Sequence, residues 1–372
     1  MPKEVRESLS QQMLHHRTSE FTEIFDRVLG RLKQVFKTQQ PVMMHTSTGS
    51  GAMESAVVNC FSAGDEVLCI RSGKFGQRWA EICEVYGLKV HPVDVEWGNS
   101  FDVEEIVNIL NEKPGICGVL TQFCETSTAT LHPVKELAAE IKNRETTLLL
   151  VDAITAIGVT PLDMDLWGLD VVIAGSQKAF MMPAGMSFIA LSEKAWGHQK
   201  YSKLPKYYFD LQSELKANKK GQTFFSSPVS HIRALDAALN YFVDGKLDQQ
   251  IKHSQAMAIC TRKVGEVLGL KIFSHSPSPS VTALEVPEGK NAEDLRKHLD
   301  QNFNVTVMGG QDHLKGRIIR LGHLGDISFS DLKFALESLA QSMIDLGWLS
   351  GENSLLSVKK TCAEILTGRS SL

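Results

Sequence analysis

Two side chains that could do chemistry follow neighbouring apolar segments of the sequence. Lys178 stands in "AGSQKAFMMPAG" (174–185), just past an apolar run, and Asp152 ends the apolar run "LLLVD". If both runs are strands of an open α/β sheet, the two residues lie at the edge where such sheets bind ligands. A carboxylate is costly to bury there unless a cation or a hydrogen-bond donor meets it. Taken singly, Asp152 could cap a turn and Lys178 could be solvated. A third sequence element decides between this structural interpretation and a functional one.

A turn rich in Gly and Ser supplies that third element. In "HTSTGSGAMESAVVNCF" (45–61) it opens an amphipathic helix, so free backbone N–H groups, small side chains and the helix dipole converge where a phosphate fits. Such turns begin many helices and alone carry little weight. Together, a phosphate cradle, an aldehyde-reactive lysine and an aspartate for a pyridinium nitrogen are what a protein supplies to pyridoxal phosphate. The combination predicts an enzyme that uses this cofactor.

The segments that must position these residues alternate between strand and helix patterns. Strands are predicted at 66–70, 89–93, 116–120, 147–153 and 169–175, and amphipathic helices at 75–87, 102–113 and 133–144. This alternation predicts an α/β fold, with a large domain whose mostly parallel sheet is flanked by helices. Beyond residue 245 or so, a long helix is followed by short strands, which predicts a smaller α+β domain. We expect an N-terminal segment at 1–16, a large cofactor-binding domain at 17–244 and a small C-terminal domain at 245–372.

Composition narrows the classes of protein. With 43% hydrophobic residues, 22% charged residues and a net charge of −4, the chain has no basic surplus for nucleic acid or anionic lipid. The 7 cysteines include no C-x-x-C pair, which disfavours iron–sulfur and structural zinc sites and fits a reduced, cytoplasmic setting. No apolar run approaches the roughly 20 residues of a membrane span. We expect a cytoplasmic enzyme that acts on small molecules, with no metal, nucleic-acid or membrane partner.

Eight motifs carry a resemblance to a known family. They are "STGSGAMES", "GKFGQRW", "ETSTAT", "VDAITAIG", "GSQKAFMMPAG", "KLPKYYFDL", "GGQDHL" and "IRLGHLG". By these motifs the sequence resembles, from about residue 13 to 345, the class V, fold type I pyridoxal-phosphate aminotransferases of the alanine–glyoxylate and serine–pyruvate type. Within them it is most similar to the branch named for the small, or 42 kDa, subunit of a soluble hydrogenase. The resemblance implies a transaminase that forms a homodimer with shared active sites.

The resemblance also implies roles for individual residues. Lys178 would form a Schiff base with the cofactor aldehyde and move the α-proton of the donor, and Asp152 would hold the ring nitrogen. Ile154 would pack under the cofactor ring, and Phe75 would stack on its other face. Ser127 would hydrogen-bond the phenolic oxygen or orient Asp152.

The phosphate and substrate contacts are implied in the same way. The residues that would bind the phosphate are Thr48, Gly49, Ser50 and Gln177, joined from the neighbouring subunit by Thr223 and Ser226. A planar guanidinium suits the α-carboxylate of an amino acid, and strand alternation puts Arg317 and Arg320 on opposite faces. The family pattern selects Arg320. Tyr207 and Tyr208 of "KLPKYYFDL" receive no chemical step.

Some features depart from the family pattern. Members usually begin with a Gly-Pro-rich loop ahead of the segment that matches "PKEV", whereas this sequence begins at Met1-Pro2. We therefore expect the segment 1–16 to be truncated relative to the family, with substrate affinity affected more than cofactor chemistry. Ala129 stands where glycine is usual, and Ser226-Ser227 stand where Thr-Pro is common, so the grip on the phosphate is expected to be weaker.

The predicted reaction is a ping-pong transamination between a small amino acid, alanine or serine, and a small 2-oxo acid, glyoxylate or pyruvate. No second arginine stands in a recognised place for a distal carboxylate, yet aspartate remains an alternative donor. Cysteine desulfuration needs a cysteine on a mobile loop, whereas Cys260 falls in a helical pattern and Cys124 lies near a strand end. The last alternatives are a subunit of a redox complex, without clustered cysteines to support it, and a catalytically degenerate subunit that still binds the cofactor.

Overall fold

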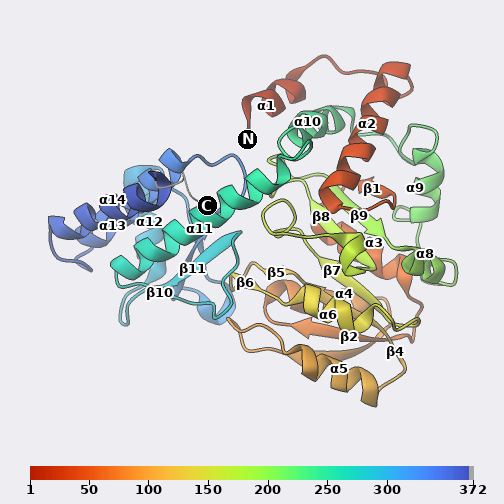
Figure 1. Ribbon diagram of the computed structural model, residues 1–372, viewed down its shortest axis with the longest axis horizontal. Helices are drawn as coiled ribbons and strands as arrows, with labels where there is room; N and C mark the ends of the chain where they lie inside the picture. The colour runs from red at the N-terminus through yellow and green to blue at the C-terminus, as the bar shows by residue number, and fades with distance from the viewer. Residues whose placement is uncertain (368–372) are drawn as a thin grey trace.

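The largest of three sheets in the described residues lies in the right-hand part of the molecule as drawn in Figure 1. The structure is a computed structural model that describes residues 1–367, and within them this sheet has seven strands in the order β1-β9-β8-β7-β4-β2-β3. The strands are β1 (Val42–His45), β2 (Glu66–Arg71), β3 (Lys89–Asp94), β4 (Ile116–Gln122), β7 (Leu148–Asp152), β8 (Val171–Gly175) and β9 (Ser187–Leu191). In this sheet β9 alone runs antiparallel to its neighbours. The predicted α/β fold with a mostly parallel sheet is confirmed.

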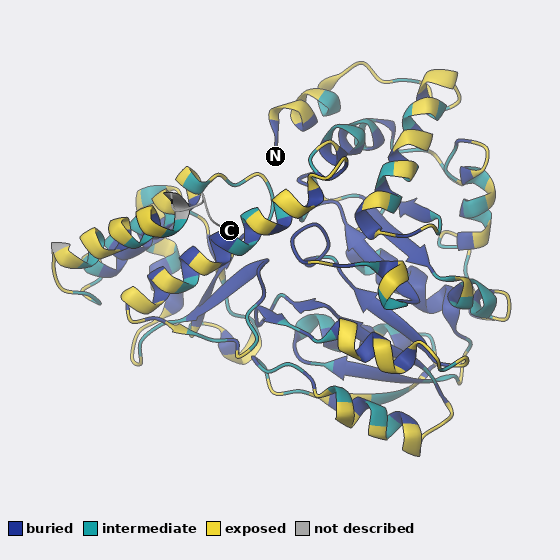
Figure 2. Cartoon of the chain, viewed as in Figure 1, coloured by how far each residue is buried: buried dark blue, intermediate teal, exposed yellow. Residues whose placement is uncertain are grey.

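Helices cover both faces of this sheet. Alternate residues of a strand point to opposite faces, so Leu149 and Val151 of β7 join one hydrophobic cluster, whereas Leu148 and Leu150 join the other. The first cluster includes residues of α2 (Ser19–Phe36), α5 (Val103–Glu112), α6 (Val134–Ile141), α7 (Met164–Trp167) and α10 (Val229–Leu239). The second includes residues of α3 (Gly49–Cys60), α4 (Lys74–Val85), α8 (Glu193–Gln199) and α9 (Leu211–Asn218). Burial on both faces explains why β7, β8 and β9 are nearly continuous apolar runs, dark blue in Figure 2.

A smaller antiparallel sheet lies in the C-terminal part of the described residues. Its order is β10-β11-β13-β12, with β10 (Lys271–Ile272), β11 (Val281–Glu285), β12 (Met308–Gly309) and β13 (Ile318–Gly322). The helices around it are α11 (Leu247–Val267), α12 (Ala292–Phe303), α13 (Phe329–Asp345) and α14 (Glu352–Thr367), and α1 (Lys3–Ser10) packs on α10. Figure 1 shows α11 leading into this part. The boundaries of the expected domains stay predictions, and residues 368–372 of the expected small domain lie outside the described residues.

The segment 274–280, which lies between β10 and β11, is hydrogen-bonded to the 124–131 hairpin. Ser278 donates its backbone N–H to the carbonyl oxygen of Ala129 at 2.9 Å, and Leu131 donates to that of Ser276 at 2.7 Å. The segment thus runs beside the short hairpin of β5 (Cys124–Glu125) and β6 (Thr130–Leu131). Ala129 has a φ of 60°, in the left-handed region that favours glycine. None of the helices in residues 1–367 is long and apolar enough to cross a membrane.

Candidate active site

A pocket opens where β7 and β8 end. Asp152 closes β7, and Lys178 follows β8 by three residues; the two strands pair in parallel, so both side chains reach the same edge of the sheet. The pocket is lined by Thr48, Gly49, Ser50, Phe75, Arg78, Thr126, Asp152, Ile154, Thr155, Gln177 and Lys178. Eight of these residues are among the predicted site residues, and Arg78, Thr126 and Thr155 are additional.

Burial changes the acid–base properties of both central residues. It raises the pKa of Asp152 to about 7, and the charge of Glu125 adds to this, whereas a hydrogen bond of 2.8 Å from the Ile154 N–H to Oδ1 and the charge of Lys178 oppose it. Burial lowers the pKa of Lys178, against the charge of Asp152. The amine therefore gives up its proton more readily than a solvated lysine does, which suits a nucleophile or a base.

The turn around Lys178 is held by Ser176. The hydroxyl of Ser176 donates to the carbonyl oxygen of Pro183 at 2.7 Å and accepts from the Met186 N–H at 3.2 Å. Its backbone N–H donates to the carbonyl oxygen of Met186 at 3.0 Å. The Met-Met-Pro-Ala-Gly segment thus folds back onto Ser176, and this closed turn fixes the backbone from which Lys178 projects.

The first turn of α3 forms another wall of the pocket. Thr48 is the N-cap residue, yet no side chain caps the helix, so free N–H groups and the positive end of the dipole face the pocket. At Gly49 a Cβ atom would meet Cδ1 of Ile154, so a larger residue would displace that side chain. This uncapped start, lined by a glycine, suits an anion that approaches the backbone closely.

Two further side chains favour an anion at this place. Arg78 donates from Nη1 to Oγ of Ser50 at 3.1 Å, and its guanidinium lies 5.0 Å from the ring centroid of Phe75. The Oε1 atom of Gln177 is buried without a hydrogen-bond partner in the described part of the chain. Because the oxygen and nitrogen of an amide are exchangeable by a flip, this side chain can donate to a bound phosphate. A cation, a free amide and an open helix terminus together fit the phosphate group of the expected cofactor.

Ser127 does not line the pocket. Its hydroxyl donates to Oε1 of Glu125 at 2.5 Å and accepts from the Lys74 N–H at 3.1 Å, while Asp152 is held through Ile154. In this structure Ser127 therefore caps the start of α4.

Arg320 lies next to the pocket wall. From β13 it donates from Nη1 to the carbonyl oxygen of Thr126 at 2.7 Å and from Nε to that of Gly309 at 2.9 Å. Within residues 1–367 no carboxylate forms an ion pair with it, although it is largely buried and burial lowers its pKa. Arg317 is exposed and pairs with Glu285 at 3.4 Å, on the opposite face.

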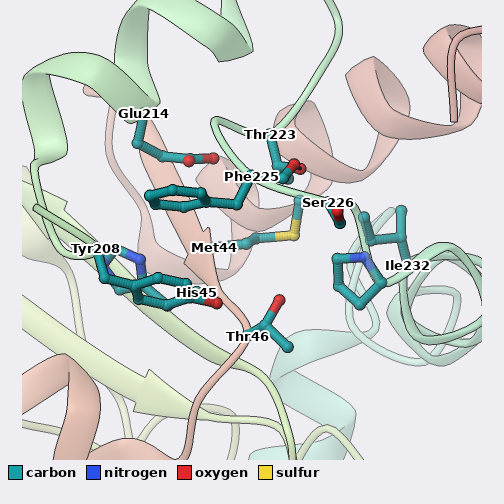
Figure 3. Close-up of a pocket in the computed structure, with 10 residues that line it drawn as sticks. Met44, His45, Thr46, Tyr208, Glu214, Thr223, Phe225, Ser226 and Ile232 are labelled. Atoms are coloured by element: carbon teal, nitrogen blue, oxygen red, sulfur yellow. Dashed lines mark hydrogen bonds between the residues drawn. The ribbon is translucent and has the colours of Figure 1, made fainter.

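Thr223 and Ser226 lie in a different pocket (Figure 3). That pocket is lined by Met44, His45, Thr46, Tyr208, Glu214, Thr223, Phe225, Ser226, Pro228 and Ile232. The Thr223 hydroxyl donates to the carbonyl oxygen of Phe225 at 2.8 Å, and the Tyr208 ring stacks on that of Phe225 with centroids 4.7 Å apart. Within one chain these two residues are therefore not brought together with Lys178.

Sequence reasoning missed three lining residues, and each had a local signal. Arg78 stands three residues after Phe75 on a predicted helix, so the two share a face. Thr126 adjoins Ser127 in "ETSTAT", and Thr155 adjoins Ile154 in "VDAITAIG". The hydroxyls of Thr126 and Thr155 lie 2.8 Å apart, which joins the two motifs.

Comparison with known proteins identifies the class. The family model described as aminotransferase class V matches residues 4–322. The chain therefore belongs to the class V aminotransferase family, whose members depend on pyridoxal phosphate.

Individual relatives align with the chain over nearly its whole length. The chain is 35% identical to the "Soluble hydrogenase, small subunit" of Synechococcus, with 94% of this chain and 91% of that protein covered. It is 30% identical to the serine–glyoxylate aminotransferase of Methylorubrum extorquens, with 93% and 89% covered. Among solved structures, the aspartate aminotransferase of subgroup IV from Thermus thermophilus matches with a TM-score of 0.87 and 30% identity, over 93% of this chain and 97% of that one.

Proposed function

We propose that the protein catalyses transamination between a small amino acid, alanine or serine, and a small 2-oxo acid, glyoxylate or pyruvate, with pyridoxal phosphate as cofactor. The observation that carries the proposal is the meeting of Lys178 and Asp152 at one sheet edge, in a pocket that also holds an uncapped helix start. When bound, the cofactor supplies an aldehyde that reacts with amines and a ring that accepts electrons from the α-carbon.

In this proposal each residue of the pocket has its own role in the reaction. Lys178 Nζ binds the cofactor aldehyde and then carries the α-proton of the donor, a role that its lowered pKa supports. The carboxylate of Asp152 holds the proton on the ring nitrogen, and its own raised pKa indicates how strongly this buried group favours a partner with a proton or a positive charge. Phe75 and Ile154 hold the two faces of the ring.

The anionic groups have separate anchors in this proposal. Thr48, Gly49 and Ser50 bind the phosphate through the first turn of α3, and Arg78 and Gln177 assist. Arg320 binds the α-carboxylate of the donor, because its guanidinium is near the pocket and has no carboxylate partner in residues 1–367. The donor leaves as an oxo acid before the acceptor binds, which gives ping-pong kinetics.

The test is an absorption titration of the purified protein with bound cofactor. L-alanine, L-serine and L-aspartate are added in turn, and we expect alanine or serine to convert the band of lysine-bound cofactor into that of its aminated form. A response to aspartate alone would favour the aspartate alternative, which is supported by the match to the Thermus thermophilus aspartate aminotransferase. A band that no donor changes would favour a degenerate member that binds the cofactor without turnover.

We also propose a homodimer in which Thr223 and Ser226 reach the phosphate bound by the partner chain. Exposed aromatic side chains surround these residues, with Tyr207 78% and Tyr208 45% exposed, which supports burial by a second chain. The test mixes a Lys178→Ala chain with a chain changed at both Thr223 and Ser226 to alanine. A mixed dimer then has one intact site and regains activity, whereas residues that act within their own chain give no recovery.

A cytoplasmic setting remains part of the proposal. The seven cysteines are all free thiols in the structure, and Cys260 and Cys124 are buried, which supports a reducing compartment.

A further inference from the structure

We propose that Glu125 is a positioning residue of this site, one that sets the cofactor-stacking ring and the substrate-binding arginine through a single short segment, 125–127. The inference rests on the proposed function. Glu125 does not line the pocket and touches neither expected ligand, so its effect passes through the backbone of α4 and through its neighbour Thr126.

Glu125 forms the main part of the cap of α4. Oε2 of Glu125 accepts from the backbone N–H groups of Phe75 at 3.1 Å and Gly76 at 3.0 Å, and Oε1 accepts from the N–H and the hydroxyl of Ser127. The Lys74 N–H donates to Ser127 Oγ. The first three N–H groups of the helix are therefore held by side chains of the 125–127 segment, where most helices rely on a cap from the preceding residue. Since Phe75 is one of the residues held, the backbone from which its ring reaches the pocket is fixed.

Gly73 makes room for this cap, and Gly76 makes room for β2 beside the same helix start. A Cβ atom at Gly73 would lie 2.3 Å from Ser127 Oγ and 2.5 Å from Cδ of Glu125. At Gly76 it would lie 2.4 Å from the carbonyl oxygen of Ile70. The "GKFG" and "ETST" motifs thus form one contact, in which the carboxylate of Glu125 approaches the backbone at Gly73 and Gly76.

The same segment also contacts β13. Thr126 lines the pocket, and its carbonyl oxygen accepts the 2.7 Å hydrogen bond from Arg320. Glu125 and Ser127, on either side of Thr126, are both fully buried and bonded to each other. A shift of Glu125 therefore moves the wall that anchors Arg320 as well as the start of α4.

The charge of Glu125 matters for this role. Both carboxylate oxygens accept two hydrogen bonds each, and all of these come from N–H or O–H donors. An amide at this position would turn its NH2 group toward two donors, so one end of the cap would be lost. Glu125→Gln keeps the size of the side chain and removes this match together with the negative charge, which makes it the informative variant.

The matched control is Asp170→Asn. Asp170 is also a buried carboxylate that accepts from a backbone N–H, that of Leu149 at 2.9 Å, and it pairs with Lys194. It precedes β8, whereas Lys178 follows that strand, so it lies at the opposite edge of the sheet. Both variants lose a buried carboxylate, and only Glu125→Gln should disturb the site.

Three measurements compare the two variants with the parent protein. Hydrogen exchange of the protein without cofactor should be faster by roughly tenfold or more at Phe75 and Gly76 in Glu125→Gln alone, as expected for a lost buried hydrogen bond. Titration of the same protein with pyridoxal phosphate should give a Kd about tenfold higher, and circular dichroism of the bound cofactor should change with the orientation of Phe75. The KM of the amino donor should rise, because Arg320 is misplaced, while Asp170→Asn lowers thermal stability only.

The outcomes separate this inference from the proposed function. If the parent protein binds no pyridoxal phosphate, the proposed function fails. If the parent binds it and Glu125→Gln has the same Kd, circular dichroism and KM, the proposed function stands and the positioning role is overturned. Unchanged hydrogen exchange at Phe75 and Gly76 in Glu125→Gln would also overturn the positioning role, whether or not the Kd of the cofactor changes.

Discussion

Arg320 and Thr126 are 194 residues apart in sequence, yet Nη1 of Arg320 donates a hydrogen bond of 2.7 Å to the carbonyl oxygen of Thr126. This contact brings a guanidinium from the smaller sheet to the wall of the pocket that contains Lys178. The other N–H groups of the Arg320 guanidinium have no carboxylate partner in the described residues, so the carboxylate of a substrate can form an ion pair with it.

Replacing Arg320 with glutamine should therefore weaken binding of the amino donor. We expect KM to rise about 100-fold, the size of a lost charge-assisted hydrogen-bond pair, while the Kd of the cofactor changes little. Steady-state kinetics and cofactor titration measure the two quantities. Arg317→Gln is the control, since Arg317 directly precedes the same strand, β13, but is exposed and paired with Glu285. Equal KM values for the two variants would contradict the role of Arg320.

Replacing Lys178 with alanine should abolish turnover. Its amine carries the proton in the proposed mechanism, so we expect kcat to fall by roughly 1,000-fold or more. Single-turnover absorption measurements with the preferred donor would detect the loss directly. Lys113→Ala, which removes an exposed lysine whose amine lies 3.2 Å from Nδ1 of His91, should leave kcat unchanged. Retained activity in Lys178→Ala would make the mechanism wrong.

The sequence predicted the part of the site that follows from strand ends. Because β7 and β8 are covered on both faces, they are continuous apolar runs, and Asp152 and Lys178 stand out as the polar residues after them. The short strands β1 and β9 were not predicted. The residues of β1, "VMMH", lack the length and alternation that mark a strand, and β9 pairs antiparallel with both its neighbours.

The rest of the site depends on contacts between distant segments. Glu125 meets the start of α4 about 50 positions away, and Arg78 meets Ser50 across 28 positions. Periodicity reports only neighbours within one element, so it cannot pair a carboxylate of one motif with the N–H groups of another. The placement of Thr223 and Ser226 in a separate pocket has the same origin, since a single sequence carries no information on a second chain's position.

Arg78 should contribute to the affinity for the cofactor. It is hydrogen-bonded to Ser50 at the uncapped start of α3 and lies against Phe75, so a bound phosphate gains a cation nearby. We expect Arg78→Gln to raise the Kd of pyridoxal phosphate about tenfold, and the difference from the parent protein to shrink as salt increases. The control is Arg71→Gln, which removes the arginine at the end of the preceding strand β2 that pairs with Asp94 instead. A Kd that is insensitive to Arg78→Gln would remove it from the phosphate site.

Asp152 should make the stability of the protein without cofactor depend on pH. Burial raises its pKa from 3.8 to about 7, so the folded chain binds this proton more tightly than the unfolded chain does. The stabilising contribution of this carboxyl to the free energy of unfolding is therefore fully present below about pH 4, and it is lost as the pH rises through about 7. In Asp152→Asn the side chain does not titrate. As the pH rises, the free energy of unfolding of the parent protein should therefore fall relative to that of the variant. Urea unfolding at several pH values, without cofactor, measures this difference and cancels the groups that titrate in both. A difference that is constant with pH would show that Asp152 is already ionised in the folded chain, and its proposed affinity for a protonated ring nitrogen would lose this support.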